Sequence, residues 1–298
     1  MSDVASVRLA SDIDSVGTQG LWGQAWRRLL RNGPGLVGLV LILLFVLVAL
    51  LAPLIAPSDP LRANLPETLQ APSVEHLMGT DLLGRDVLGR VVYGARISLL
   101  ASVVSVIVGL VAGGIIGSIA GALGGRVDAV LMRIVDTLMA IPSVLLAIGI
   151  VATLGRGLPQ IMFAVGIANA PVFARILRGT LLEVRTAEYV VAARSLGASE
   201  LRLLLRHMLP NSLTPIVVAA TLALATALID VASLGFLGLG PPDPRTAEWG
   251  TMLTDSTQFL REAPWLIFFP AAALVLTAIG FNLLGDGLRA SLDPRMKR

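Results

Sequence analysis

The segment 188–211 reads EYVVAARSLGASELRLLLRHMLPN, a polar and basic stretch between two long apolar runs. Residues 186–196 favour a helix, and Gly197 is placed to end it, because glycine enters the left-handed cap without a steric cost. Ser199 is placed to cap a second helix through its side-chain oxygen, and Pro210 is placed to stop it. The segment therefore predicts two short helices joined by a bend.

The second of these helices is expected to have an apolar side and a basic side. The apolar side combines Leu201, Leu204, Leu205 and Met208, and the basic side Arg202, Arg206 and His207. In the first helix, Ala192 and Ala193 are small enough for another surface to approach closely. Two interpretations are open for this hairpin: an amphipathic element on anionic lipid, or a surface that docks onto another protein.

The composition is that of an integral membrane protein. Of 298 residues, 55% are hydrophobic and only 14% are charged. The absence of cysteine excludes disulfides and thiolate chemistry. The single lysine is Lys297, so the chain lacks the Gly-Lys-Ser/Thr phosphate-binding loop. We therefore expect that this chain does not hydrolyse ATP.

Apolar runs divide the chain. The first, 35–56, contains 22 residues without a charge, about 33 Å as a helix, which crosses a hydrocarbon core of about 30 Å. Five further spans are predicted at 97–125, 127–153, 157–174, from about 213, and at 263–285. The resulting parts are a tail 1–34, a first span 35–57, a polar segment 58–96, a core 97–290 that contains the loop 179–211, and a tail 291–298.

Glycines recur every fourth residue in the second predicted span. They are Gly109, Gly113, Gly117 and Gly121. This spacing places them on one ridge, where another helix can pack backbone to backbone. Close packing is favoured over the alternative, a flexible gating helix.

Polar residues inside the predicted spans are candidates for a pathway or for structural bracing. They are Asp136, Asn169, Asp230 and Asn282. Asp136 shares its span with Asp128 and Arg133, and structural ion pairing is favoured there over a proton relay. For Asp230, substrate contact and helix bracing are equally open.

The polar segment before the second span contains Asp81, Arg85 and Asp86. The alternating acids of a calcium loop are missing, so a structural or interfacial role is favoured over a metal site. His76 has no partner at ligand spacing and is interpreted as an ordinary surface residue. No metal site is predicted.

The sequence of the predicted hairpin resembles a loop of a known protein family. The spacing of Ala192-Ala193, Gly197 and Leu209-Pro210 is similar to the EAA loop of permease subunits in ABC importers, which docks into the ATP-hydrolysing subunit. Val191 stands where that motif has its glutamate, with Glu188 three residues upstream, and His207 stands where an isoleucine is usual. The stretches 76–99, 229–250 with its Trp249-Gly250 pair, and 281–298 resemble the C-type subunit of dipeptide and oligopeptide permeases.

This resemblance covers residues 35–298 and implies an all-α membrane protein with the type I ABC importer fold. Five core spans and one additional first helix make six, with both termini cytoplasmic. The implied function is that of a peptide permease subunit, not an enzyme, which forms half of a translocation pathway. Coupling to the ATPase is implied for Glu188, Ala192, Ala193, Gly197, Leu209 and Pro210.

The implied partners are a second, B-type permease subunit, two ATP-binding subunits, an extracytoplasmic binding protein and membrane lipids, without nucleic acid. No cofactor is expected in this chain, because ATP and magnesium bind to the partner subunits. The basic residues agree with this topology. Sixteen of the 23 lie on the side of the termini and seven on the other, which places the termini and the hairpin in the cytoplasm of a cell or inner membrane.

Three alternatives stay open. Importers of nickel or another small solute share this architecture. An ion-coupled secondary transporter would show internal repeats and ionisable residues in both halves, and no convincing repeat is found. A membrane-embedded enzyme is the least favoured class, because the sequence contains no HExxH motif or catalytic Ser-His-Asp set.

Overall fold

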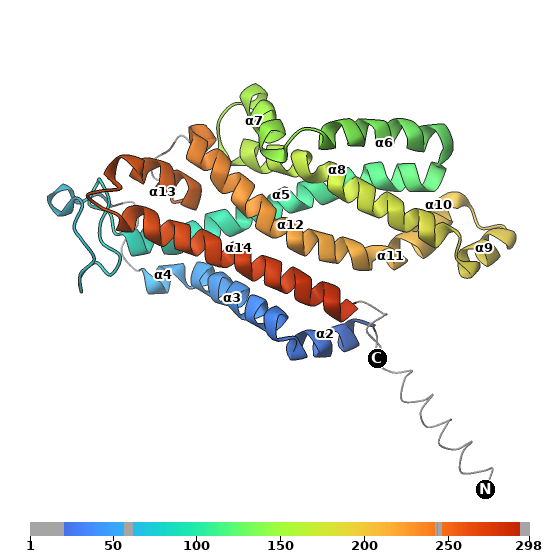
Figure 1. Cartoon of the computed structure of the whole chain (residues 1–298), viewed down its shortest axis with the longest axis horizontal. Coiled ribbons are helices and arrows are strands. Elements are labelled where there is room, and N and C mark those ends of the chain that lie inside the picture. Colours follow the sequence, from blue (N-terminus) through green and yellow to red (C-terminus); the bar gives the residue numbers. More distant parts are fainter. Residues whose placement is uncertain (1–20, 57–61, 242, 244–245, 293–298) are drawn as a thin grey trace, which may run out of the picture.

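The computed structural model describes residues 21–56, 62–241, 243 and 246–292, which form helices and loops without a strand (Figure 1). Long helices run along the bundle: α3 (Gly33–Leu50), α5 (Val87–Leu123), α8 (Leu158–Arg185), α12 (Leu213–Leu234) and α14 (Trp265–Leu292). Within the described residues, these five elements, α12 together with its continuation to Leu239, are long and apolar enough to cross a membrane. The expected all-α membrane architecture is confirmed.

Short elements connect and flank the long helices. They are α2 (Leu21–Arg31), α4 (Ala52–Ile55), η1 (Leu65–Glu67), α6 (Gly125–Met139), α7 (Ser143–Leu154), α9 (Glu188–Ser195), α10 (Glu200–Leu203), η2 (Leu204–Met208), α11 (Leu209–Asn211), η3 (Gly235–Leu239), α13 (Trp249–Ser256) and η4 (Thr257–Phe259). Elements η2 and η3 are π-helical, whereas η1 and η4 are 3₁₀ turns.

The third predicted span, 127–153, is not one straight helix. It is divided into α6 and α7, whose axes bend by 95° at the break. Pro142 has no N–H to donate and disfavours the helical conformation of the preceding residue, Ile141, so the helix ends before the proline and restarts after it. The expected six spans therefore become five continuous helices and one bent pair.

Several other helix ends differ from the predicted bounds. Helix α5 begins at Val87, ten residues early, because the Asp86 carboxylate accepts a hydrogen bond from the Gly89 N–H at 2.9 Å and caps it. Residues 87–96 thus belong to a helix and not to the polar segment. Helix α8 runs through Pro171 and continues to Arg185 rather than ending at 174. Helix α14 likewise continues past 285 to Leu292.

The glycine ridge of α5 packs against α8, as predicted. A Cβ on Gly109 would lie 2.8 Å from the Gly166 carbonyl oxygen, and one on Gly113 would clash with the backbone at Ala170. Gly117 and Gly121 meet the same helix further along, against Ala174 and Leu181. The absence of side chains on the ridge lets two backbones come into close contact over three helical turns.

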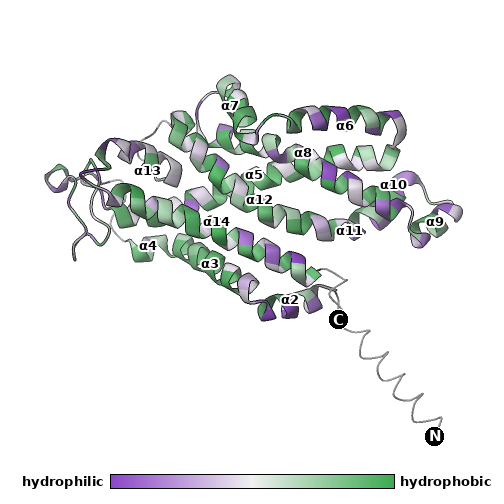
Figure 2. Ribbon diagram, in the orientation of Figure 1, coloured by the Kyte–Doolittle hydropathy of each residue, from purple (hydrophilic) through white to green (hydrophobic). Residues whose placement is uncertain are grey.

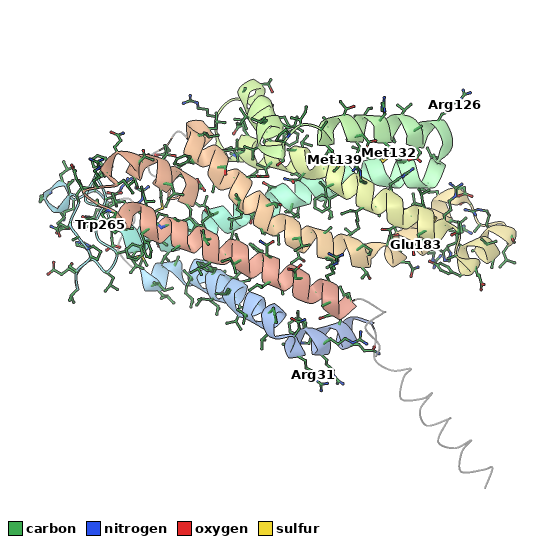
Figure 3. The ribbon with its side chains drawn as sticks, in the orientation of Figure 1. Arg31, Arg126, Met132, Met139, Glu183 and Trp265 are labelled. Carbon is green, nitrogen blue, oxygen red and sulfur yellow. The ribbon has the colours of Figure 1, made fainter. Side chains whose placement is uncertain are left out.

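The two ends of the bundle are more hydrophilic than its middle (Figure 2). Helix α2, the end of α14 and the α9–α10 hairpin lie at one end, and α13 with the loop 62–86 lies at the other (Figure 1). Hydrophilic residues gather at these ends, whereas the long helices between them are mostly hydrophobic (Figure 2). Side chains of Arg31, Arg126 and Glu183 mark the hairpin end and Trp265 the opposite one (Figure 3).

Helix α2 was expected to be part of a polar tail, but it folds as an amphipathic helix against α14. Leu29 is buried beside Gly35 and Gly287, where both glycines allow close approach. Trp26 and the arginines of the last turn, Arg28 and Arg31, are exposed or partly exposed. This division suits a helix that lies at a membrane surface.

Candidate functional site

The bend of the hairpin is a complete helix-ending motif. Gly197 adopts a φ of +86°, and its N–H donates to the Arg194 carbonyl at 3.0 Å. The next N–H, that of Ala198, donates to the Ala193 carbonyl at 3.1 Å. These two bonds define the Schellman arrangement, in which a residue with positive φ reverses the chain direction. The prediction that Gly197 ends the first helix is confirmed.

The second arm begins as predicted and ends differently. The Ser199 hydroxyl accepts from the Arg202 N–H at 3.4 Å and caps α10. Pro210 does not stop this arm, which continues through η2 and α11 to Asn211. In η2 the Leu209 N–H donates to the Leu204 carbonyl, and this wider π-turn accommodates the proline ring.

Buried apolar side chains fasten the hairpin to the bundle. Val190, Leu203 and Met208 are fully buried, and they pack with Leu181 of α8 and Ile216 of α12 in one cluster. Burying such a side chain contributes roughly 1.5–3 kcal/mol each. The base of the hairpin is therefore packed onto α8 and α12 and is not a loose loop.

Other leucines of the hairpin are exposed. Leu196 at the bend is 89% exposed, Leu201 is 66% exposed and Leu205 is 58% exposed. The predicted apolar side of the second arm is divided: Met208 is buried and Leu204 is half-buried in the base, whereas Leu201 and Leu205 are exposed. Leu203, outside the predicted side, is also buried. Tyr189 and Val191 are also exposed on the first arm. We call these five exposed apolar residues of the hairpin the hairpin surface.

An ion pair connects the two arms across the bend. Arg194 Nε lies 2.9 Å from Glu200 Oε1. The hydrogen bond from Arg194, together with its charge, holds the pKa of the Glu200 carboxyl below its usual value. Glu188 at the start of α9 is exposed, and its carboxylate has no hydrogen bond or ion pair within the residues that the structure describes.

The remaining predicted coupling residues lie around the hairpin surface. Ala192 is exposed beside Val191, whereas Ala193 is half-buried against the base. Leu209 is also half-buried in the base, and Pro210 is exposed. The fold thus gathers all the predicted coupling residues on one hairpin, with some at its surface and others in its anchor.

Two of the predicted intramembrane polar residues come together. Asp230 on α12 is buried, and its carboxyl interacts with the side chains of Asn169 on α8 and Ser143 at the start of α7. Three helices therefore meet at one carboxyl, and one of them starts at the break after Pro142. The free N–H groups of that helix start also favour a nearby acid.

Asp136 and Asn282 do not join this group. Asp136 on α6 pairs with Arg175 on α8, and Asp128 pairs with Arg178, whose Nε lies 2.9 Å from Asp128 Oδ1. Both acids thus form ion pairs, which agrees with the favoured interpretation, and their partners come from α8. Asn282 is exposed on α14.

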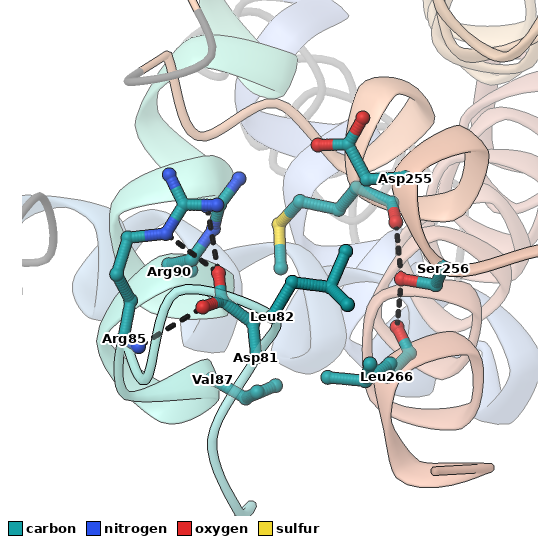
Figure 4. A pocket seen from close by; sticks show the side chains of 9 residues that line it. Asp81, Leu82, Arg85, Val87, Arg90, Asp255, Ser256 and Leu266 are labelled. Carbon is teal, nitrogen blue, oxygen red and sulfur yellow. Dashed lines mark hydrogen bonds and ion pairs between the residues drawn. The ribbon is translucent and has the colours of Figure 1, made fainter. Parts of the chain in front are cut away.

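The opposite end of the bundle contains a buried charge cluster (Figure 4). Asp81 Oδ2 accepts from Arg85 Nε at 2.6 Å and from Arg90 Nη1 at 2.9 Å, and all three side chains are buried. Asp255 on α13 faces the same arginines, although burial raises the pKa of its carboxyl. This arrangement joins the polar loop to α5 and α13, and it agrees with the structural role favoured for this region.

His76 is not an ordinary surface residue. Its Nδ1 lies 3.0 Å from Asp86 Oδ2 and its Nε2 lies 3.3 Å from Glu67 Oε2. The hydrogen bond with Asp86 and the charges of both acids raise the pKa of the imidazole above its ordinary value of 6.5. The histidine thus holds two parts of the loop together.

Glu248 is a structural residue that sequence reasoning missed. Its buried carboxylate accepts from the Gly250 N–H at 2.8 Å and from the Thr251 N–H at 2.9 Å, and it caps α13. Trp249 beside it is fully buried and donates from Nε1 to the Val91 carbonyl at 3.0 Å. The available signal was an acid directly before the Trp249-Gly250 pair, because acids are favoured at helix starts. Among the described residues, no group of His, Cys, Asp and Glu is placed to hold a metal ion.

The fold matches that of solved ABC importers. It is similar to the MetNI methionine ABC transporter in inward-facing conformations, with a TM-score of 0.56 and 23% identity over 68% of this chain and 96% of that chain. A second crystal form of the same transporter gives a TM-score of 0.55. These likenesses show the fold, which is that of the membrane-spanning part of an ABC transporter.

The sequence comparisons specify the family. Residues 113–298 match the binding-protein-dependent transport system inner membrane component, and residues 20–72 match the N-terminal TM domain of oligopeptide transport permease C. The chain belongs to the family of binding-protein-dependent transport system inner membrane components. Such subunits work with ATP-binding subunits and a substrate-binding protein, and they are not themselves the enzyme.

Individual relatives are similar over almost their whole length. A dipeptide transport system permease protein, DppC, of Alkalihalophilus pseudofirmus is 45% identical over 93% of this chain and 90% of its own. A putative peptide transport system permease protein of Brucella abortus is 45% identical over 91% of each. The glutathione transport system permease protein GsiD of Shigella flexneri is 44% identical over 93% of this chain and 91% of its own.

Proposed function

We propose that this chain forms half of the translocation pathway of an ATP-driven importer of short peptides, and that its hairpin docks onto an ATP-binding subunit. The observation that carries the docking role is the hairpin surface. It exposes Leu196, Leu201 and Leu205 on a structure whose base is buried against α8 and α12. Exposed leucines on a fixed support are the arrangement that a protein partner recognises.

The substrate class rests on the relatives. Those with 44–45% identity over most of both chains are named for dipeptide, peptide and glutathione transport, which supports a short peptide as the substrate. Nickel or another small solute remains the alternative within this architecture. The ligand of the cognate binding protein decides between them.

The proposed assembly pairs this chain with a second, B-type permease subunit above two ATP-binding subunits, which hold ATP and magnesium. The distribution of basic residues supports a membrane orientation with the termini and the hairpin in the cytoplasm. In this orientation the hairpin reaches the compartment where the ATP-binding subunits bind ATP.

The proposed mechanism is alternating access. Closure of the ATP-binding subunits moves the hairpin, and α8 and α12 transmit this movement because the hairpin base packs on Leu181 of α8 and Ile216 of α12. The glycine ridge then requires α5 to move with α8, since their backbones are in close contact. A tightly packed pair moves as one body and does not deform.

Charge substitutions in the hairpin surface test the docking role. Leu196→Glu combined with Leu205→Glu should leave the fold intact, because both side chains are exposed. The same substitutions should abolish co-purification of the ATP-binding subunits that accompany the wild-type chain, because a docked interface would bury two unpaired charges. Leu65→Glu, at a 68% exposed position near the other end of the bundle, is the matched control.

The outcomes are distinct. Loss of the ATP-binding subunits from the double variant and their retention by the Leu65→Glu control support docking at this surface. Wild-type amounts of these subunits on the double variant would overturn it. Peptide as the substrate is tested separately, by mass spectrometry of ligands eluted from the cognate binding protein.

A further inference from the structure

An apolar groove lies between α3 and α5, away from the hairpin. It has a volume of about 350 Å³, and its lining combines Val46, Ala49 and Leu50 of α3 with Arg96, Leu99, Leu100 and Val103 of α5. Ala49 and Leu99 are buried at 7% and 8% exposure and form the floor. Leu50, Leu100 and Val103 are exposed and form the rim. The groove is therefore open along its length to whatever surrounds the bundle.

Arg96 is the only charged residue in this lining. It occupies the last position before the charge-free run 97–125, so it stands where α5 leaves the apolar interior of a bilayer. Its side chain is exposed, and no hydrogen bond or ion pair to it is found in the part of the chain that the structure describes. A guanidinium at this depth selects an anionic group, and a phosphate matches its paired donors.

Arg96 and the groove also share one face of α5. Leu100 follows Arg96 by four residues and Val103 by seven, which places all three on one stripe of the helix. The stripe is about 10 Å long, at about 1.5 Å per residue. A single ligand with a phosphate at Arg96 would therefore extend an apolar chain along the rim toward the bilayer centre.

We infer that this groove binds one phospholipid, with its phosphate on Arg96 and an acyl chain between α3 and α5. This inference requires only that α3 and α5 cross a bilayer, and it does not depend on peptide import or on hairpin docking. The charge of Arg96, its depth and the apolar stripe below it together match a phospholipid, which combines both chemical parts in this order.

The test uses the intact importer, purified with its partner subunits in a gentle detergent and then depleted of lipid. Palmitoyl-oleoyl-phosphatidylglycerol is added, and native mass spectrometry counts the molecules retained. The diacylglycerol with the same chains is the comparison ligand, because it lacks only the phosphate headgroup. Arg96→Gln removes the charge, Val103→Phe fills the rim, and Arg261→Gln changes another exposed arginine outside the groove.

We expect retention of phosphatidylglycerol by the wild-type and Arg261→Gln complexes. Arg96→Gln should weaken it about fivefold, because one arginine near a membrane surface contributes about 1 kcal/mol to lipid binding. Val103→Phe should weaken retention of phosphatidylglycerol although Arg96 is present. The wild-type complex should retain the diacylglycerol about as weakly as Arg96→Gln retains phosphatidylglycerol. Equal retention by wild type and Arg96→Gln would overturn the inference.

A second measurement identifies a protein occupant. Because the chain has no cysteine, Leu100→Cys provides a single thiol on the rim of the groove. Cross-linking of this thiol to the second permease subunit in native membranes would show that protein fills the groove, and would overturn the lipid site. Labelling by a lipid-soluble thiol reagent without such a cross-link supports it.

Discussion

Arg194 Nε lies 2.9 Å from Glu200 Oε1, and this ion pair joins the two arms of the hairpin across the bend at Gly197. Both side chains are partly or largely exposed, so the pair is worth only about 0.2–1 kcal/mol. The angle between the arms is therefore fixed mainly by the backbone at the bend, where the N–H groups of Gly197 and Ala198 donate hydrogen bonds to the end of α9.

The first prediction concerns that angle. Gly197→Val should distort the bend, because Val at a φ of +86° costs roughly 1–2 kcal/mol or more. ATP hydrolysis should persist in proteoliposomes while uptake falls. Gly179→Val is the control, since a Cβ at either glycine has open space but Gly179 has helical φ. Full uptake by Gly197→Val would contradict a coupling role for the hairpin.

The second prediction separates two neighbouring glycines of α5. Gly113→Ala places a methyl group against the Ala170 backbone, whereas Gly114→Ala places it in open space. The first change should destabilise the α5–α8 contact by about 1–3 kcal/mol, as overpacking does. The second should leave stability unchanged or raise it slightly. Equal melting temperatures of the two purified variants in detergent would argue against close packing along the ridge.

The third prediction concerns the charge cluster at the opposite end. Asp81→Asn leaves the buried guanidinium groups of Arg85 and Arg90 without their shared carboxylate, which should cost about 3–5 kcal/mol. Glu75→Gln changes an exposed acid of the same loop and should have little effect. Thermal unfolding of both variants provides the comparison, and an unchanged midpoint for Asp81→Asn would refute the structural role.

The fourth prediction is a pH dependence of the loop 62–86. Asp86 and Glu67 raise the pKa of His76 above 6.5, so the protonated ring stabilises the loop fully below the unfolded-state pKa. This contribution is lost as the pH rises through the folded-state pKa. Protease cleavage within the loop should therefore become faster in the wild type as the pH rises above 6.5. In His76→Gln the rate of this cleavage should be independent of pH, once the pH dependence of the protease itself has been corrected for.

The fifth prediction decides between the two roles open for Asp230. If its carboxyl braces α7 and α8 through Ser143 and Asn169, Asp230→Ala should lower stability by about 1–3 kcal/mol, as an unsatisfied buried group does. Asp230→Asn retains a hydrogen-bond acceptor, so it should lose less stability than Asp230→Ala, and its KM for the transported substrate should be unchanged. A raised KM with an unchanged melting temperature in Asp230→Asn would instead indicate substrate contact.

Much of the fold follows from local chemistry in the sequence. The charge-free runs predicted the membrane helices, since their length and polarity are properties of consecutive residues. Gly197 and Ser199 predicted the bend and the second arm for the same reason, because helix ends depend on a few neighbouring groups. The four-residue spacing predicted the ridge on α5, because helical periodicity places such glycines on one face.

Contacts between distant segments decided the rest. Pro142 breaks a helix that hydropathy alone reads as continuous, whereas Pro171 and Pro210 remain inside helical segments, and a π-turn accommodates Pro210. Which leucines of the hairpin are exposed depends on α8 and α12, which bury Leu203 and leave Leu201 and Leu205 free.

The charged groups also divide into pairs that are close in the sequence and pairs that only the fold brings together. Asp81 with Arg85 lies within one short stretch, but its partner Arg90 and the facing Asp255 belong to two helices that only the fold brings together. Asp230 is near Asn169 and Ser143 for the same reason. The sequence alone determined the membrane helices, the ridge and the hairpin, because these depend on neighbouring residues. Tertiary structure determined the polar partners and the exposed surface, because helix packing sets distances between residues far apart in the chain.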